Sequence, residues 1–279
     1  MSPSIFSATL FWEVLGLLFA LALLISAAGF IRIYYFVSLG YAFSIAAMAV
    51  LTPLIYRAHL DIWSALQCAG LLAYGLRLGI FLLRRERSPS YQKEMLGVIE
   101  RGRHIQGTIK ILIWISVALL YVLMFSPALF ALQKHKDQPG LGPLLSQFPG
   151  LFIMALGLAL EAMADHQKSA YKAENPHRFC DIGLYRLVRC PNYMGEVVFW
   201  IGAWIAGLSS YAHPLHWAMS LGGLICIILV MLGSTRRLEL KQNERYGANP
   251  EYQAYTRSVP VLIPFLPIYS FKNLKIYLG

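Results

Sequence analysis

The sequence predicts an all-α integral membrane protein with seven transmembrane helices. Apolar residues make up 57% of the 279-residue chain, charged residues make up only 14%, and the mean hydropathy is +0.55. This composition is typical of a polytopic membrane protein. A helix needs about 20 residues to cross a hydrocarbon core of about 30 Å. Seven stretches are near or above that length: 8–31, 33–56, 62–84, 109–133, 149–167, 192–212 and 214–234.

The first four stretches fill the N-terminal half of the chain. Residues 8–31 lack a basic leading segment and a small-residue cleavage pattern, so we interpret them as a retained span rather than a signal peptide. The second and third stretches follow after short connections, and the third carries Arg77 inside its apolar run. A long polar loop is expected at 85–108, before the fourth stretch.

The fifth stretch is the least apolar, because Glu161, Asp165 and His166 lie in its last turns. It could instead be a helix that runs out into the aqueous phase. The sixth stretch should begin near Pro191, since a proline lacks the N–H that would be unpaired in the first turn of a helix anyway. The seventh stretch is followed by a basic, tyrosine-rich segment.

The basic residues predict the orientation of these spans. All but four of the 24 Lys and Arg residues fall on one side of the membrane, the exceptions being Arg57, Arg77, Lys134 and Lys136. By the positive-inside rule that side is cytoplasmic, which places the amino terminus outside and the carboxyl terminus inside. The net charge of +10 therefore does not indicate a nucleic-acid partner, because the charge is not gathered in one soluble patch.

We expect a single membrane domain over 1–279, with four N-terminal helices in 1–133 and a C-terminal region in 149–279. No internal repeat, Rossmann fingerprint or P-loop is present. No disulfide is expected, because the four cysteines fall in spans or on the cytoplasmic side. No metal site is expected either, since His166 and His177 lack a ligand spacing.

The segment EAMADHQKSAYK, residues 161–172, is the first candidate site. Glu161 and Asp165 are four residues apart and share a helix face, and Lys168 and Lys172 follow them. One interpretation is a solvated helix end with ordinary ion pairs. The other is the polar wall of a ligand site, in which the two lysines and Arg178 meet phosphates.

The segment RCPNYMGE, residues 189–196, is more specific. Asn192 and Glu196 lie on one helix face, and Gly195 leaves room for a ligand to approach the backbone. A charged residue in a span costs about 3 kcal/mol at mid-depth, so it indicates function by default. Because Glu196 is only one turn from the boundary, a carboxylate that reaches to water is an equal alternative.

Two further candidates lie in the N-terminal spans. Tyr74 and Arg77 are three residues apart on one face of the third span, and an arginine there should face the bundle interior or an aqueous cavity. Tyr74 could donate a hydrogen bond to a substrate carbonyl, or it could be a packing residue with a satisfied hydroxyl. Glu13 in the first span is the other candidate.

The segment 236–264 is amphipathic, basic and rich in tyrosine. It could be a helix that lies on an anionic membrane surface. Alternatively it is a lid over a charged cofactor, in which case Arg236, Arg237 and Tyr246 would contact that cofactor.

Three quoted segments carry a resemblance to a known family: ADHQKSAYK, GLYRLVRCPNYMGEVVFWIGAWIAG and ERYGANPEYQAYTRSVPVLIP. They resemble the C-terminal membrane domain of the steroid 5-alpha-reductase family, which belongs to a wider group with sterol reductases and isoprenylcysteine carboxyl methyltransferases. The match is dense over about residues 160–265. Upstream, LLAYGLRLGIFLLRRE is its main anchor.

The resemblance implies a membrane enzyme with a cytoplasmic NADPH site. The missing ER retrieval signal and the short tail are compatible with a bacterial inner membrane, which we expect as its location. Its reaction would be reduction of a carbon–carbon double bond conjugated to a ketone, in a steroid or sterol-like substrate taken from the membrane lipid. By the same resemblance Asp165, Asn192 and Glu196 are cofactor positions, Lys172 and Arg178 belong to the same pocket, and Lys168, Arg236, Arg237 and Tyr246 are expected beside it.

The resemblance also assigns a substrate site. Tyr74 resembles the tyrosine that binds the substrate ketone, with Arg77 nearby. The family's Gln-Glu pair is absent from the second span, so we expect Glu13, Tyr34 or Tyr41 to replace it. Cys190 also stands where bacterial relatives commonly have histidine, so a proton-transfer role there is not expected. The alternatives are a membrane methyltransferase that uses S-adenosylmethionine and a non-catalytic sterol-binding protein.

Overall fold

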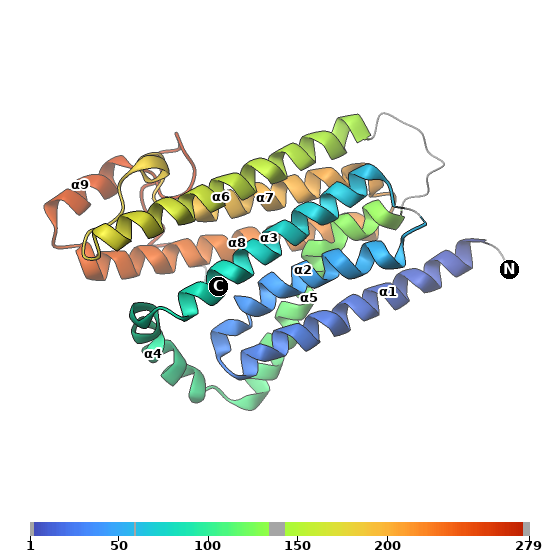
Figure 1. The fold of residues 1–279 in the computed structure, drawn as a ribbon, viewed down its shortest axis with the longest axis horizontal. Coiled ribbons are helices and arrows are strands. Elements are labelled where there is room, and N and C mark those ends of the chain that lie inside the picture. The colour runs from blue at the N-terminus through green and yellow to red at the C-terminus, as the bar shows by residue number, and fades with distance from the viewer. Residues whose placement is uncertain (1–2, 59, 134–142, 276–279) are drawn as a thin grey trace. The chain divides into compact units, whose positions relative to one another are not determined.

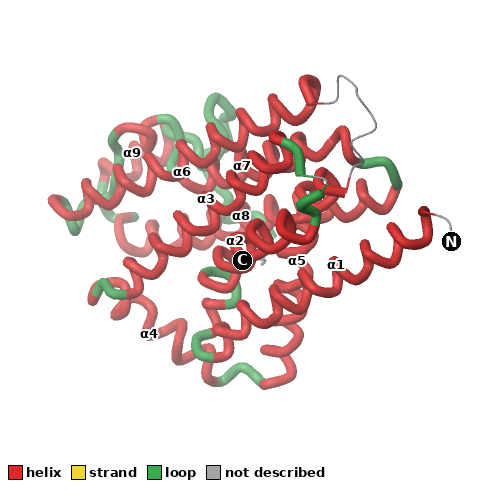
Figure 2. Tube along the Cα trace, turned by 45° about the vertical axis from the view of Figure 1, so that its right-hand side comes forward, coloured by secondary structure: helices red, strands yellow, loops and turns green. Residues whose placement is uncertain are grey.

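The computed structural model describes residues 3–58, 60–133 and 143–275, and over these residues the chain is helical and without strands (Figures 1 and 2). Lys134 and Lys136 lie outside the described residues. The α-helices are α1 (Pro3–Ser26), α2 (Leu39–Ile55), α3 (Ile62–Glu86), α4 (Pro89–Arg103), α5 (Gly107–Gln133), α6 (Phe148–Glu174), α7 (Pro191–Gly207), α8 (Pro214–Tyr246) and α9 (Pro250–Ser258).

The chain divides into two compact units. Unit 1 comprises Met1–Gln147 and Ala206–Gly223, and unit 2 comprises Phe148–Ile205 and Leu224–Gly279. Unit 1 therefore takes in the first four long helices together with Ala206–Gly223, and unit 2 takes in the rest of the C-terminal half.

Within the described residues, six helical stretches are long and apolar enough to cross a membrane, which is the character of an integral membrane protein. They are Leu10–Phe30, Ile33–Ile55, Ile62–Glu86, Gly107–Gln133, Leu145–Glu174 and Pro214–Tyr246. The predicted span 192–212 corresponds to α7, which begins at Pro191 as expected but has only 17 residues. Its α-helix ends at Gly207, where a short 3-10 turn, Leu208–Ser210, follows.

Two other segments differ from the sequence-based expectation. Much of the predicted polar loop 85–108 is helix α4, which has Pro89 in its first turn. Helix α6 continues to Glu174, well past residue 167, so the alternative of a helix that runs beyond the span describes it better.

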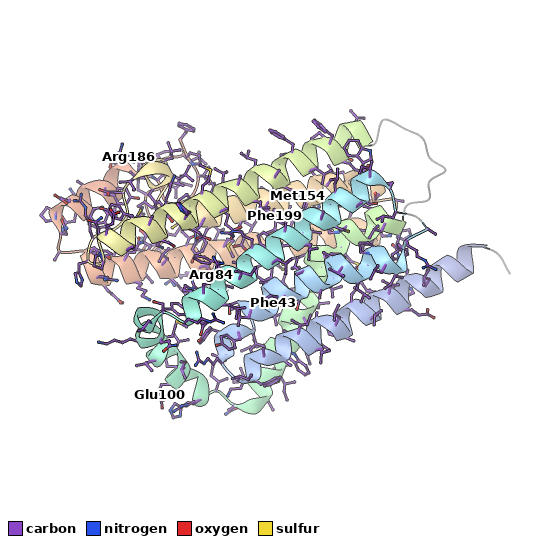
Figure 3. The ribbon with its side chains drawn as sticks, in the orientation of Figure 1. Phe43, Arg84, Glu100, Met154, Arg186 and Phe199 are labelled. Atoms are coloured by element: carbon purple, nitrogen blue, oxygen red, sulfur yellow. The ribbon has the colours of Figure 1, made fainter. Side chains whose placement is uncertain are left out.

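In unit 1, α2 packs most extensively against α3. Two small residues on α3 allow this approach, because a Cβ on Gly75 would lie 2.5 Å from the Ala42 carbonyl oxygen and one on Gly79 would lie 2.7 Å from the Phe43 ring (Figure 3). The two glycines form a GxxxG motif, which brings membrane helices close together. On α5, Trp114 Nε1 donates to the Leu23 carbonyl oxygen of α1 at 2.8 Å.

In unit 2, α6 and α7 run antiparallel with their backbones almost touching (Figure 3 labels Met154 and Phe199 at this contact). A Cβ on Gly195 would lie 2.7 Å from the Glu161 nitrogen, one on Gly202 would lie 2.5 Å from the Met154 nitrogen, and one on Gly157 would collide with the Phe199 backbone. Glycine spacing therefore fixes the register of the two helices.

The C-terminal part of unit 2 folds back along α7. Asn249 Oδ1 accepts a hydrogen bond from Glu251 N at 2.8 Å and caps α9. The tail that follows, residues 260–275, is joined to the segment before α7 by hydrogen bonds from Arg189 N to Pro260 O at 2.9 Å and from Cys190 N to Val261 O at 3.0 Å. Figure 1 shows α9 beside the carboxyl-terminal ends of α6 and α8.

Candidate functional site

The middle of α6 and the start of α7 hold buried acids. Glu161, Asp165 and Glu196 are 3%, 8% and 6% exposed. Because Glu161 touches Gly195 across the helix pair, the antiparallel register sets Asp165 one turn further on, level with the first turn of α7. The acids therefore cluster at one end of the α6–α7 pair.

Asn192 is in the first turn of α7, at the same level as Asp165. Its Oδ1 atom is buried and accepts no hydrogen bond from any residue that the structure describes. A buried acceptor without a donor costs about 1–3 kcal/mol. The position therefore suits a ligand that brings an N–H or O–H group.

Gln167, inside the ADHQKS segment, holds the loop between α6 and α7. Its Oε1 accepts a hydrogen bond from Leu184 N at 2.9 Å. The preceding Gly183 has φ +55°, and a Cβ there would lie 2.5 Å from Gln167 Oε1. Sequence reasoning missed this role, although a glycine that opens a turn was visible in DIGLY.

Lys172 and Arg178 contact protein groups around this loop. Lys172 Nζ donates to the Tyr246 hydroxyl at 2.7 Å and to the Arg178 carbonyl oxygen. The exposed Arg178 guanidinium lies 3.3 Å from Asp181 and 3.5 Å from Glu251, and the negative charge of Asp181 raises the pKa of Arg178. Both cations, predicted to meet a cofactor, therefore anchor the loop in this structure.

The remaining predicted cofactor residues lie on α6 and α8. Lys168 is half-buried one turn after Asp165. Burial raises the pKa of the Cys190 thiol, and the positive charge of Lys168 opposes this effect in part. Arg236 Nε donates to the Lys272 carbonyl oxygen at 3.3 Å, and the exposed Arg237 donates to Ser234 Oγ at 3.2 Å.

Four aromatic rings join the loop to α8 and α9. Phe179 lies 5.2 Å from the rings of Tyr252 and Tyr255 and 6.0 Å from the ring of Tyr246, centroid to centroid. Burial raises the pKa of Tyr252 to about 12. The Tyr255 hydroxyl donates to the Tyr185 carbonyl oxygen at 2.6 Å, so α9 is tied to the loop by a polar contact as well.

A buried ion pair, which the sequence did not reveal, fixes the start of α7 to α8. Arg189 Nη2 lies 3.1 Å from Glu239 Oε1, and the two side chains are 2% and 4% exposed. The same Arg189 nitrogen donates to the Tyr269 carbonyl oxygen at 2.5 Å, and Glu239 Oε2 accepts from Phe271 N at 2.8 Å. Through these two hydrogen bonds, the Arg189–Glu239 ion pair also fixes the tail to α8 and to the start of α7.

Cys190 packs in an apolar cluster with Val261, Leu262 and Phe271. Burial raises the pKa of its thiol to about 11. The thiol is therefore protonated at neutral pH and surrounded by hydrocarbon.

In unit 1 the predicted substrate residue Tyr74 is fully buried and paired with Tyr41. The two hydroxyl oxygens lie 2.7 Å apart, and the Tyr41 ring stacks on Tyr121 at a centroid distance of 5.5 Å. The Tyr121 hydroxyl in turn donates to the Phe36 carbonyl oxygen. Of the candidates to pair with Tyr74, the structure thus brings Tyr41 to it.

The other predicted substrate residues lie elsewhere in unit 1. The Tyr34 hydroxyl donates to Glu86 Oε2 at 2.9 Å, and Arg32 lies at the same distance from that oxygen. Arg77 lies over the Phe81 ring at 6.0 Å, and Glu13 is exposed on α1. Tyr34 therefore belongs to a charged cluster between the 3-10 turn Ile33–Tyr35, which precedes α2, and the end of α3.

A model of the family described as proteins of unknown function, DUF1295, matches residues 12–259. The chain belongs to the DUF1295 family. The match includes Tyr41, Tyr74, Asp165, Asn192 and Glu196, and it ends before the tail that the Arg189–Glu239 pair holds. No curated protein and no solved structure matches this DUF1295 chain.

Proposed function

We propose that this DUF1295 protein is a membrane-bound, NADPH-dependent reductase. Its reaction would be reduction of the carbon–carbon double bond of a lipophilic enone, with a 3-oxo-Δ4 steroid as the first substrate to test. The choice of reaction rests on the resemblance of residues 160–265 to the steroid 5-alpha-reductase family.

The observation that carries the cofactor part of the proposal is the buried polar end of the α6–α7 pair. Asn192 and Glu196 lie there at the start of the largely apolar α7, and Asp165 lies level with them on α6. Asn192 Oδ1 has no donor among the described residues. An amide or amine group of a nucleotide, such as a carboxamide or an adenine amine, offers the N–H that this oxygen needs. Buried acids can accept further hydrogen bonds from ribose hydroxyls.

Phosphate groups also need cations. Lys168, Arg236 and Arg237 are candidates for this role. Arg236 and Arg237 would exchange their hydrogen bonds to Lys272 O and Ser234 Oγ for a phosphate, and Lys172 and Arg178 would have to exchange loop contacts. Lys172 and Arg178 therefore contribute to the proposal mainly by ordering the loop.

The substrate part of the proposal rests on the Tyr41–Tyr74 pair. NADPH would supply a hydride to the β-carbon of the enone while a proton reaches the α-carbon and charge grows on the carbonyl oxygen. On substrate binding the Tyr74 hydroxyl would exchange its hydrogen bond with Tyr41 for one donated to that oxygen. A donor placed at a developing oxyanion is worth about 3–4 kcal/mol.

We further propose that α7 acts as a seventh span, with the amino terminus outside and the carboxyl terminus in the cytoplasm. Seventeen residues are at the lower limit for crossing a bilayer, and the distribution of Lys and Arg favours this orientation. The host membrane would be a bacterial inner membrane.

The test is cofactor-dependent turnover by the detergent-purified protein with progesterone or testosterone, followed as loss of NADPH absorbance with the product identified by mass. We expect a product two hydrogens heavier. Tyr74→Phe should lower kcat by about 10²–10³, and Asn192→Leu or Glu196→Gln should weaken NADPH binding.

Tyr56→Phe is the matched control, because the Tyr56 hydroxyl is also buried in unit 1 but bonds to Gln133 at 3.0 Å. Equal loss of activity in Tyr56→Phe and Tyr74→Phe would contradict the role of the pair. Binding of S-adenosylmethionine in place of NADPH would overturn the proposal in favour of a methyltransferase.

A further inference from the structure

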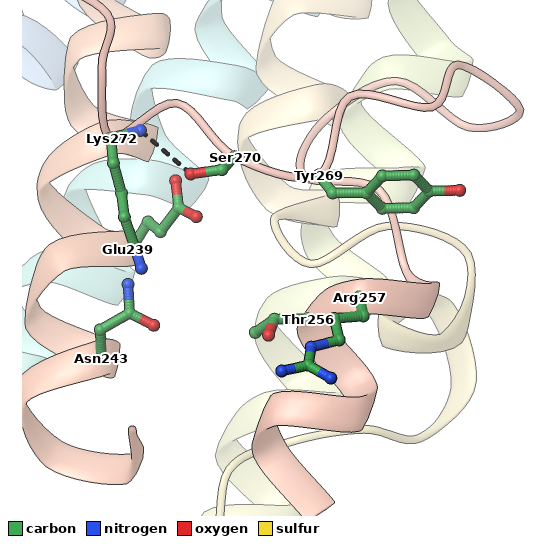
Figure 4. A pocket seen from close by; sticks show the side chains of 7 residues that line it. All are labelled: Glu239, Asn243, Thr256, Arg257, Tyr269, Ser270 and Lys272. Carbon is green, nitrogen blue, oxygen red and sulfur yellow. Dashed lines mark hydrogen bonds between the residues drawn. The ribbon is translucent and has the colours of Figure 1, made fainter. Parts of the chain in front are cut away.

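A cavity of about 310 Å³ lies between α8, α9 and the tail in unit 2 (Figure 4). It is lined by seven residues with polar or charged groups: Glu239, Asn243, Thr256, Arg257, Tyr269, Ser270 and Lys272. Three of these residues belong to the tail, beyond the part of the chain that matches the DUF1295 family. The cavity is therefore separate from Asp165, Asn192 and Glu196, none of which lines it.

The cavity presents hydrogen-bond donors that lack an acceptor. Asn243 Nδ2 is buried and has no hydrogen-bond partner among the described residues. In Figure 4 the Lys272 side chain extends along α8 toward Asn243, and the Arg257 guanidinium points into the cavity from α9. Ser270 Oγ accepts from Lys272 N at 3.2 Å and keeps its own proton to donate.

Neither Lys272 nor Arg257 forms an ion pair with an acid in the described part of the chain. Glu239 is the acid in the lining, but the buried Arg189 balances its charge at 3.1 Å, and Phe271 N occupies its second oxygen. The net charge around the cavity is therefore positive. Convergent cations and neutral donors are the groups that bind a phosphate.

The cavity lies where α8 leaves its apolar stretch. That stretch ends at Gly233, Arg236 and Arg237 are the first charged residues after it, and Glu239 follows within about one turn. Basic residues at such a boundary lie at the level of the lipid headgroups. A phosphate bound at the level of the headgroups would be that of a phospholipid.

The tail beside the cavity exposes large apolar side chains. Phe265 is 96% exposed, and Ile263 and Leu266 are 46% and 45% exposed. A second cavity, of about 270 Å³, shares Tyr269 with the first and brings Arg186 together with Phe265 and Leu266. Exposed apolar side chains surrounded by basic ones are typical of a segment that enters a membrane interface.

We propose that this cavity binds the phosphate of an anionic phospholipid headgroup. Phe265, Ile263 and Leu266 would insert among the adjacent acyl chains. Lys272, Arg257 and Asn243 would contact the phosphate oxygens, and Ser270 would donate a further hydrogen bond. The site would fix the tail on the membrane surface. It does not depend on the reductase proposal.

The experiment measures the unfolding temperature of the full-length purified protein as dioleoylphosphatidylglycerol is added to the detergent micelles. A ligand that binds the folded state raises this temperature in a saturable way, and the apparent Kd follows from the concentration dependence. Dioleoylphosphatidylcholine, inorganic phosphate and NADPH serve as comparison ligands. Variants are first compared without lipid to establish that they fold.

We expect Lys272→Gln and Asn243→Leu to weaken phosphatidylglycerol binding by about tenfold, which is the loss of one charge-assisted or buried hydrogen bond. Lys275→Gln removes the same charge from the same tail but outside the cavity, and it should change the Kd by less than about twofold. Phe265→Ser should weaken lipid binding without changing the response to inorganic phosphate.

Three results would overturn the proposal. Equal effects of Lys272→Gln and Lys275→Gln, with none from Asn243→Leu, would mean that diffuse surface charge attracts the lipid. Saturation by inorganic phosphate at the same concentrations as the lipid would show a free-anion site. Loss of the lipid effect in saturating NADPH would assign the cavity to the cofactor.

Discussion

Arg189 Nη2 lies 3.1 Å from Glu239 Oε1, and both side chains are almost completely buried although 50 residues separate them in the chain. We expect Arg189→Met to lower the free energy of unfolding by about 3–5 kcal/mol, because Glu239 would remain buried without a counter-charge. Denaturant titration in mixed micelles measures this change.

The double variant Arg189→Met/Glu239→Gln should recover most of that loss, since the glutamine oxygen can still accept from Phe271 N. Arg103→Met is the control, because Arg103 and Glu100 form an exposed pair at 3.3 Å and should contribute less than about 1 kcal/mol. If the double variant were no more stable than Arg189→Met, the ion pair would not explain the loss.

The contact between α6 and α7 makes a second prediction. Gly157→Ala should destabilise the protein by about 1–3 kcal/mol or more, because the new Cβ collides with the Phe199 backbone, which cannot rotate away. Gly222→Ala on α8 has open space around its Cβ and should be neutral or slightly stabilising. Thermal unfolding in detergent measures both, and similar shifts for the two variants would contradict the close packing.

A third prediction concerns the loop before α7. Gly183→Ala should cost about 1–2 kcal/mol for the left-handed backbone alone, and more for the collision with Gln167. Adding Gln167→Ala should relieve the collision but not the backbone strain, and it also removes the hydrogen bond to Leu184 N. The two substitutions together should therefore cost less than the sum of their separate effects, but the double variant should stay less stable than the parent protein. Stability that is unchanged in Gly183→Ala would show that the loop has another conformation.

Cys190 predicts a dependence of stability on pH. Its folded pKa of about 11 is above the ordinary thiol value of about 8.5, so its contribution to stability is fully present below about pH 8.5. Above that pH the unfolded chain loses the proton first, and the contribution falls by about 2–3 kcal/mol by pH 11.

Cys190→Ala should therefore show a shallower loss of stability than the parent protein between about pH 8.5 and 11. Unfolding temperatures at matched ionic strength measure the two slopes. Identical slopes would mean that the Cys190 thiol does not resist ionisation. Tyr252, whose pKa is raised to about 12, contributes to the remaining slope in both proteins.

Much of the fold was predictable because hydrophobic periodicity and length are local properties. The apolar stretches around Gly16, Met48 and Val117 had to become helices, and Pro191 marked the start of α7. Helix α4 was not predicted, because residues 85–108 are too polar to indicate a membrane span. Whether such a segment forms a helix depends on the residues that pack against it. The early end of α7 at Gly207 was also missed, since the apolar run continues past it.

The candidate site was predictable to a similar extent. The sequence placed Asn192 and Glu196 in the first turns of a helix, because Pro191 marks its start, whereas Asp165 lies well inside α6, which continues to Glu174. It also supplied Tyr74, but it left Glu13, Tyr34 and Tyr41 as equal partners for it. The hydrogen bond between Tyr41 and Tyr74 and the exposure of Glu13 are properties of helix packing.

By itself, the sequence determined that the chain is an α-helical membrane protein and which ends of its helices carry polar groups. The tertiary structure decided that Arg189 meets Glu239, that Lys172 and Arg178 anchor a loop, and that the tail closes a cationic cavity over α8. The physical reason is that composition and periodicity act within one element, whereas ion pairs, glycine contacts and cavities arise only where distant elements pack together.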